Sequence, residues 1–145
     1  MAGLFLLDEP ETHQLGFERP PAKPGHRIMI KLIGLLKKKP GLTRQAFIDY
    51  YEHSHAPLVS RLVPIGPDYR RSYTDRMRVN GQEVDDTFEY DVISEVWFDQ
   101  AEDYAAFAEA MRKPEIFGQI VADEENFLDR SASRILMVTE YRSAP

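Results

Sequence analysis

Hydrophobic residues from position 28 onward fall into four segments that have the spacing of β-strands. Residues 28–36, 91–98 and 134–141 are apolar on both sides with few interruptions, as strands buried on two faces are. Residues 69–79 alternate, with arginine and hydroxyl side chains on one side and a mixture of apolar and polar groups on the other. We therefore predict four strands, and one of them, over 69–79, has a solvent-exposed face.

Segments with helical spacing connect these strands. Thr43 suits an N-cap, and apolar residues then recur every three or four positions to about Leu62. A second helix is predicted over 101–112, and residues 116–128 are predicted as one or two short helical pieces. The apolar stripe of the first helix consists of Phe47, Tyr51, Ser54, Leu58 and Leu62.

The first helix contains a local break in its pattern. His53 and His55 precede Pro57, which has no N–H and leaves the carbonyl of His53 without its usual donor. At about 100° per residue, His55 lies near the apolar stripe and His53 lies on nearly the opposite side. We predict that the turn kinks or widens beside His55, with this histidine facing the protein and His53 facing solvent.

Residues 1–26 lack such periodicity and contain four prolines, so they are predicted to form an extended arm ahead of one domain over 27–145. The order of elements in the domain is βαββαβ, which folds most simply as an α+β, four-stranded antiparallel sheet with both helices on one face. Because three strands are apolar on both sides, the other face is predicted to pack on the sheet of an identical subunit, giving a homodimer.

Composition narrows the classes of partner. A formal net charge of −6 argues against nonspecific binding to nucleic acid, which needs clustered lysine and arginine. The chain has no cysteine, so disulfides, thiolate metal sites and cysteine nucleophiles are excluded. No stretch has the length of a membrane span, and the first residues lack the pattern of a secretory signal. We therefore expect a cytoplasmic protein that does not associate with membranes.

The domain contains an ordered set of motifs: Met29-Ile30-Lys31-Leu32-Ile33, the run from Lys37 to Thr43, Phe47, Tyr50, Tyr51, His53, His55-Ala56-Pro57, Glu95-Val96-Trp97-Phe98 and the run from Asp123 to Asp129. This set resembles the EthD family. The likeness covers about residues 28–142 and does not extend to the arm. It implies a ferredoxin-like fold of the dimeric α+β barrel type, in agreement with the order of elements above.

The resemblance leaves several activities open. The family is named from a bacterial ether-degradation operon in which its member looks accessory to a monooxygenase system, and fungal relatives act as decarboxylases or dehydratases on aromatic polyketides. Related α+β barrels include cofactor-free monooxygenases, polyketide cyclases and heme enzymes. For this chain the resemblance implies a helix-borne histidine, His55, that faces a pocket between helices and sheet.

His55 is the candidate general acid or base, because imidazole titrates near neutral pH and the residue borders an apolar face. Tyr73 and Asp75 are its candidate catalytic partners, since a hydroxyl or a carboxylate can orient the imidazole or take a second proton. Glu95 is an alternative to Asp75 in that role. The other interpretation is that His55 is a core histidine hydrogen-bonded to a strand.

Candidate substrate-binding residues lie around this helix and on the strands. Tyr51 and Trp97 suit a planar aromatic ligand, although aromatic residues at such spacing are also typical of a core. Lys31 interrupts an apolar strand and can either bind a carboxylate or enolate or extend to the rim. The remaining candidates are Ser54 and Phe127.

The segment that Phe127 anchors offers a carboxylate, at Asp123 or Asp129, that either points inward or only caps a helix. No metal site is predicted, because His53 and His55 point about 160° apart on a helix, whereas helical ligand pairs are spaced i and i+4. The sequence contains no glycine-rich phosphate-binding loop and no dinucleotide-binding fingerprint, so a reaction without a cofactor is the simplest hypothesis.

Three functions remain open at this point. The leading hypothesis is a small dimeric enzyme that uses His55 for proton transfer on a hydrophobic aromatic or polyketide-like metabolite, through decarboxylation, dehydration or cyclisation. One alternative is a noncatalytic ligand-binding or accessory protein of a catabolic or oxygenase system. The other is a monooxygenase-like oxidoreductase.

Overall fold

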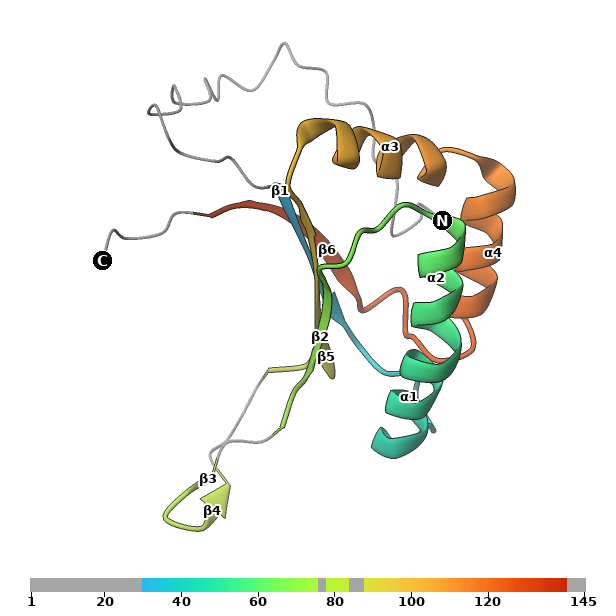
Figure 1. Ribbon diagram of the computed structural model, residues 1–145. Helices are drawn as coiled ribbons and strands as arrows, with labels where there is room; N and C mark the ends of the chain where they lie inside the picture. Colours follow the sequence, from blue (N-terminus) through green and yellow to red (C-terminus); the bar gives the residue numbers. More distant parts are fainter. Residues whose placement is uncertain (1–29, 76–77, 84–87, 141–145) are drawn as a thin grey trace.

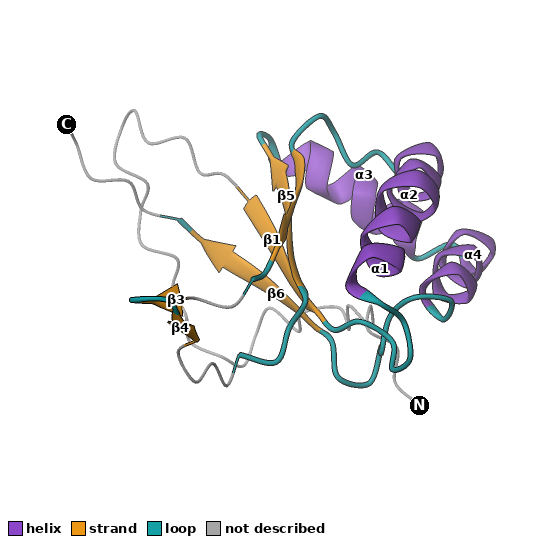
Figure 2. Ribbon diagram, turned by 90° about the horizontal axis from the view of Figure 1, so that it is seen from below, coloured by secondary structure: helices purple, strands orange, loops and turns teal. Residues whose placement is uncertain are grey.

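A four-stranded antiparallel sheet forms one layer, and the helices lie on one of its faces (Figure 1, Figure 2). The computed structural model describes residues 30–75, 78–83 and 88–140, so the predicted arm lies outside the described residues. The strand order β2-β5-β1-β6 is that of a ferredoxin-like fold, which confirms the predicted fold class. The strands are β1 (Ile30–Leu36), β2 (Tyr69–Tyr73), β5 (Val92–Phe98) and β6 (Arg134–Thr139).

Strand β1 is central and pairs antiparallel with β5 and β6, so that Leu32 lies opposite Val96 on one side and Met137 on the other. Burial alternates along β5, because every second side chain points to the helices and the others point to the open face of the sheet. Strands β1 and β5 therefore have one largely buried face and one partly exposed face, whereas in β6 even Met137, on the helical side, is 57% exposed. The side chains of β5 on the helical side are Val92, Ser94, Val96 and Phe98.

The first helix starts where the sequence predicts. Helix α1 (Arg44–Tyr50) is capped by Thr43, whose hydroxyl accepts a hydrogen bond from the N–H of Ala46 at 3.1 Å. This contact satisfies one of the backbone donors that a helix N-terminus leaves free. Phe47, one turn further on, is completely buried against the sheet.

The helix widens before Pro57, as predicted. Residues 51–55 form a π-helical turn in which the N–H of Ala56 bonds to the carbonyl of Tyr51. Helix α2 (Ala56–Leu62) follows, with Pro57 in its first turn. A first-turn residue needs no backbone donor, so proline is tolerated there once the preceding turn has adjusted.

The wide turn changes which residues face the core. The predicted stripe contains Ser54, Leu58 and Leu62, but Ser54 is exposed, and Val59 and Val63 are the buried residues of this stretch. A π turn holds more residues than an α turn, so after it the residue that faces the core comes one position later in the sequence than a regular helix predicts. The prediction for Ser54 is wrong for this reason, while Leu58 and Leu62 are half-buried and Leu62 packs against the core.

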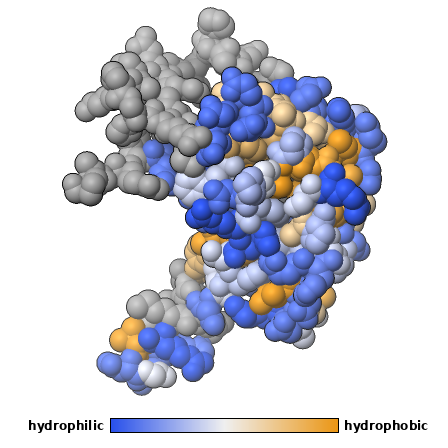
Figure 3. Space-filling view, in the orientation of Figure 1, coloured by the Kyte–Doolittle hydropathy of each residue, from blue (hydrophilic) through white to orange (hydrophobic). Residues whose placement is uncertain are grey.

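Helices α3 (Ala101–Met111) and α4 (Pro114–Glu124) complete the helical layer. They match the predicted helices over 101–112 and 116–128, except that α4 starts two residues earlier, at a proline that suits a first turn, and ends earlier. Figure 3 shows hydrophobic side chains gathered where α2 approaches α3, while most of the rest of this side is polar.

The strand predicted over 69–79 is shorter in the structure. It ends at Tyr73, and β3 (Arg78–Val79) pairs with β4 (Gln82–Glu83) as a separate hairpin. Asn80-Gly81 between them has positive φ at both residues, 52° and 78°, as Asn-Gly favours in a two-residue hairpin turn. The hairpin lies apart from the four-stranded sheet, on the side away from the helices (Figure 1).

Phe127 is expected to contribute strongly to stability. Its side chain has no exposed surface, and its ring centre lies 5.0 Å from that of Tyr50 and 4.9 Å from that of His55. Phe127→Ala should lower the free energy of unfolding by about 3–5 kcal/mol, because it leaves a cavity in the core. Urea unfolding followed by circular dichroism measures this change. Met137→Ala, at a side chain that is 57% exposed, is the control, and equally small effects in the two variants would contradict the expectation.

Candidate active site

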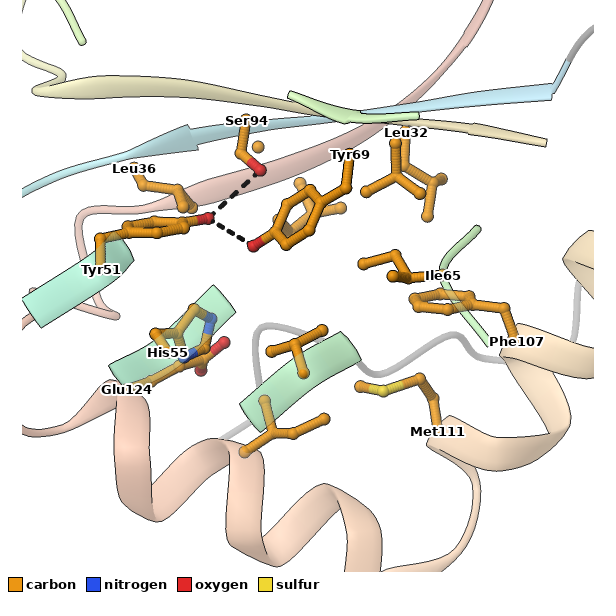
Figure 4. A pocket seen from close by; sticks show the side chains of 15 residues that line it. Leu32, Leu36, Tyr51, His55, Ile65, Tyr69, Ser94, Phe107, Met111 and Glu124 are labelled. Atoms are coloured by element: carbon orange, nitrogen blue, oxygen red, sulfur yellow. Dashed lines mark hydrogen bonds between the residues drawn. The ribbon is translucent and has the colours of Figure 1, made fainter. Parts of the chain in front are cut away.

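A cavity lies between the sheet and the helices, and its lining is mainly apolar (Figure 4). The side chains of His55 and Glu124 line the cavity from the helical side, and those of Tyr69 and Ser94 descend from the sheet. Tyr51 comes from the π turn and reaches across to the sheet with its hydroxyl. The cavity thus places one imidazole, one carboxyl and three hydroxyls around an apolar space.

The cavity has a volume of about 70 Å³. An apolar cavity of about 150 Å³ holds benzene, so this space admits a few non-hydrogen atoms without movement of its lining. Gly34 in the sheet lines this cavity and adds to its volume by having no side chain. A Cβ at this position would lie 3.2 Å from the side chain of Ile135. The geometry favours a small ligand, or the end of a larger one.

His55 is held in place from α4. Its Nδ1 lies 2.7 Å from Oδ2 of Asp123, whose other oxygen accepts a hydrogen bond from the Tyr50 hydroxyl at 2.8 Å. The side-chain amide of Asn126 donates to that hydroxyl at 2.9 Å, and the ring of Phe127 packs against the imidazole. Because a carboxylate accepts the hydrogen bond at Nδ1, the proton is held there and Nε2 presents its lone pair.

The atom Nε2 of His55 is the reactive position of this arrangement. His55 is 5% exposed and lines the cavity, and within the described ranges no hydrogen bond reaches Nε2. Burial lowers the pKa of His55 below its ordinary value, and the hydrogen bond and charge of Asp123 oppose part of this shift. The imidazole is therefore uncharged at neutral pH, and Nε2 can accept a proton.

The three hydroxyls form a hydrogen-bonded chain on the sheet side. The hydroxyl of Tyr51 donates to Oγ of Ser94 at 3.2 Å and lies 2.9 Å from the hydroxyl of Tyr69. Burial raises the pKa of both tyrosines, that of Tyr69 well above its ordinary value, so both remain protonated. Behind them, Arg71 lies over the ring of Tyr69 and is held by Glu52 through hydrogen bonds of 2.9 and 2.7 Å.

Glu124 is the second titratable group at the cavity wall. It is 3% exposed, and Nε of Arg130 donates to its Oε2 at 2.8 Å. Burial raises the pKa of Glu124 to about 7, against the opposing effect of Arg130. Both protonation states of this carboxyl are therefore populated near neutral pH.

The predicted site residues are only partly brought together. His55 and Tyr51 line the cavity. Phe127 supports the imidazole ring from outside the cavity. Tyr73 donates a hydrogen bond to Glu52 at 2.7 Å and is not among the lining residues.

The other predicted site residues lie elsewhere. Lys31 and Trp97 are on the open face of the sheet, where Nζ of Lys31 lies 4.0 Å from the centre of the Trp97 ring and pairs with Glu95. Ser54 is on the solvent side of the helix because of the π turn, and Asp75 is exposed beyond the end of β2. The partner of the imidazole is thus Asp123, one of the two candidates for an inward carboxylate in the sequence.

Three polar lining residues are absent from the sequence prediction. Ser94 lies between Val92 and Val96 on the buried side of β5, and Glu124 follows Ile120 by four positions in α4. Each is therefore a polar residue at a position where the period predicts an apolar one, which is the signal that would have identified it. Tyr69 lies on the mixed side of its strand and carries no comparable signal.

Two negative findings concern the described residues alone. Within them, no group of three or more histidine, aspartate or glutamate side chains is arranged to hold a metal ion. None of their helices combines the length and the apolar character that crossing a membrane requires.

One family model and several solved structures match the chain. Residues 39–131 match the model described as the EthD domain. An EthD-like protein from Ralstonia eutropha JMP134 is similar over 79% of this chain and 92% of its own, with 19% identity and a TM-score of 0.51. A NIPSNAP-like domain protein from Burkholderia xenovorans matches 83% and 91% of the two chains, with 17% identity and a TM-score of 0.53. At these identities the structures show a shared fold, and no curated protein sequence matches the chain.

Asp123→Asn is expected to alter the titration of His55. The carboxylate stabilises the charged imidazole, so its loss should lower the pKa of His55 further, and the proton should no longer be confined to Nδ1. A ¹H–¹⁵N NMR titration of the ring nitrogens measures both effects. The signals of His53, on the exposed side of the helix, are the internal control. An unchanged titration and an unchanged tautomer would contradict the assigned role of Asp123.

Proposed function

The chain belongs to the EthD family, and we propose that it is an enzyme in which His55, oriented by Asp123, transfers protons on a small hydrophobic metabolite. The observation that carries this proposal is an imidazole whose Nδ1 lies 2.7 Å from a carboxylate and whose other nitrogen borders an apolar cavity. A carboxylate that fixes the tautomer is a common way to hold a histidine base in a productive orientation. Packing alone gives no reason to bury such a polar pair.

Decarboxylation, dehydration and cyclisation of aromatic or polyketide-like compounds fit this chemistry. In each reaction a C–C or C–H bond next to a carbonyl group breaks, and the carbonyl oxygen gains negative charge. Hydroxyl donors near that oxygen lower the barrier. The chain of Tyr51, Tyr69 and Ser94 supports such a role on the sheet side. The reaction then uses side chains of the protein alone, and the small volume favours a compact substrate or the end of a longer one.

His55→Gln should strongly reduce turnover at this site. Small β-keto acids and β-hydroxy ketones serve as probes for loss of carbon dioxide and of water, followed by mass spectrometry. We expect the rate above buffer to fall by at least about 10²-fold, because general acid–base catalysis contributes about 10²–10⁴-fold. His53→Gln, on the exposed side of the same helix, is the matched control. Unchanged turnover in His55→Gln would sink the proposal, and binding without reaction in both proteins would favour the ligand-binding alternative.

The open face of the sheet supports a homodimer as a further part of this proposal. Opposite the helices, β1, β5 and β6 carry a row of apolar side chains, and Leu136 among them is 46% exposed. An apolar face is self-complementary when two copies are related by a twofold axis, and exposed apolar patches of this kind mark interfaces. The apolar residues on this face are Ile33, Leu35, Ile93, Leu136 and Val138.

The mass in solution tests the homodimer. Light scattering should give twice the chain mass of 16.7 kDa, and Ile33→Glu should give the mass of one chain, because a charge cannot be buried unpaired between two sheets. Arg61→Glu, on the exposed side of α2, is the control for the change of charge. A wild-type protein with the mass of a single chain would contradict the homodimer.

A further inference from the structure

The carboxyl of Glu124 borders the same cavity as the imidazole of His55 (Figure 4). Helix α4 ends at this residue, and its neighbour Asp123 holds Nδ1 of His55. One helix end therefore supplies both the carboxylate that orients the base and a second carboxyl beside the ligand space. The proposed function uses the first of these two groups and leaves the second without a role.

Among the described residues, a hydrogen bond holds only one oxygen of Glu124. Arg130 contacts Oε2 through Nε alone, although a guanidinium can bind both oxygens of a carboxylate in parallel. Its Nη2 is instead buried without a hydrogen-bond partner, and in the part of the chain that the structure describes no hydrogen bond reaches Oε1 of Glu124. The ion pair with Arg130 therefore leaves Oε1 available to a ligand.

The surroundings of Glu124 keep the carboxyl partly protonated near neutral pH. Burial is the largest influence and favours the protonated form, as does the negative charge of Asp123. The C-terminal end of a helix also disfavours a carboxylate. Arg130 is the opposing group and favours the charged form. The titratable groups that face it from the other elements are His55 and Tyr51 on the first helix and Tyr69 on β2, all uncharged at neutral pH.

We infer that Glu124 is the acid that acts together with His55, and that the substrate is a small carbonyl compound with a hydrogen on the neighbouring carbon. This inference rests on the proposed function. Nε2 of His55 takes that hydrogen as a proton, and the electron pair of the broken C–H bond forms a C=C bond. The carbonyl oxygen takes the proton from Oε1 of Glu124, giving an enol, an imidazolium and a carboxylate. The reverse transfers restore the ketone.

The apolar lining explains why a base alone is insufficient here. Removing a proton beside a carbonyl would create an enolate, and a full negative charge in an apolar space of this size is costly even where neutral hydroxyls stabilise it. A carboxylic acid that gives up its proton as the charge forms removes that cost. The volume of about 70 Å³ restricts the reaction to a compact ketone or aldehyde, or to the end of a longer one.

Exchange of hydrogen for deuterium tests this role without a known natural substrate. Butan-2-one and cyclopentanone are incubated with the protein in D₂O, and ¹H NMR follows the loss of the signals next to the carbonyl. The wild type should exchange faster than buffer, and Glu124→Gln should lower that rate by about 10²-fold. Glutamine still accepts the hydrogen bond from Arg130 but gives no acidic proton. Glu125→Gln, at the exposed next residue, is the control and should exchange at the wild-type rate.

The dependence of the exchange rate on pH separates proton donation from a structural role. The active form has an uncharged His55 and a protonated Glu124, so the rate should fall above about pH 7 as Glu124 loses its proton. It should also fall on the acid side as His55 gains one. Arg130→Gln removes the charge that favours the carboxylate, which should raise the pKa of Glu124 and move the alkaline limb to higher pH.

The possible results distinguish this inference from the proposed function. Exchange that requires His55, is unchanged in Glu124→Gln and keeps its alkaline limb in Arg130→Gln overturns the role of Glu124 and leaves the proposed function intact. A wild type that exchanges neither ketone faster than buffer also overturns it. The proposed function is then decided by the comparison of His55→Gln with the wild type on the keto acids and hydroxy ketones.

Discussion

Pro57 lacks a backbone donor, and the candidate site depends on how the helix adjusts to this lack. The preceding turn widens, and the N–H of Ala56 bonds to the carbonyl of Tyr51 five residues back. The widened turn keeps His55 on the buried side together with Tyr51 and leaves Ser54 exposed, whereas an ordinary helical turn would place both His55 and Ser54 near that side. A single missing hydrogen therefore keeps Ser54 out of the core.

The second requirement is that the end of α4 meets this turn. Asp123 and Glu124 are far from His55 in sequence, and their meeting depends on the packing of Phe127 against the rings of Tyr50 and His55. Burying an imidazole and a carboxyl costs stability relative to apolar residues of the same size. The fully buried aromatic core on either side offsets that cost. Polar groups concentrated at one cavity in an otherwise apolar layer are typical of functional sites.

The sequence is sufficient for the fold class, the capped start of the first helix, the widened turn and the inward orientation of His55, because each follows from local spacing or from proline chemistry. It fails for the stripe beyond the turn, since a constant rotation per residue cannot include a π turn. It also does not distinguish Asp123 from Asp129 as the partner of His55, because only tertiary packing brings one of them to the imidazole. Ser94 and Glu124 are different, since each breaks an apolar period and is recognisable for that reason.

Side chains along a strand point alternately to the two faces of the sheet. This alternation separates the residues of the cavity from those of the proposed dimer surface. In β5, Ser94 points to the cavity, whereas its neighbours Ile93 and Glu95 point to the open face. Lys31 and Trp97 belong to that open face as well, so in a face-to-face dimer they would meet the partner sheet and not a substrate under the helices. The groups that would carry out the chemistry all come from one subunit. Pairing of the sheets can therefore stabilise the layer that supports the cavity without contributing a reacting group to it.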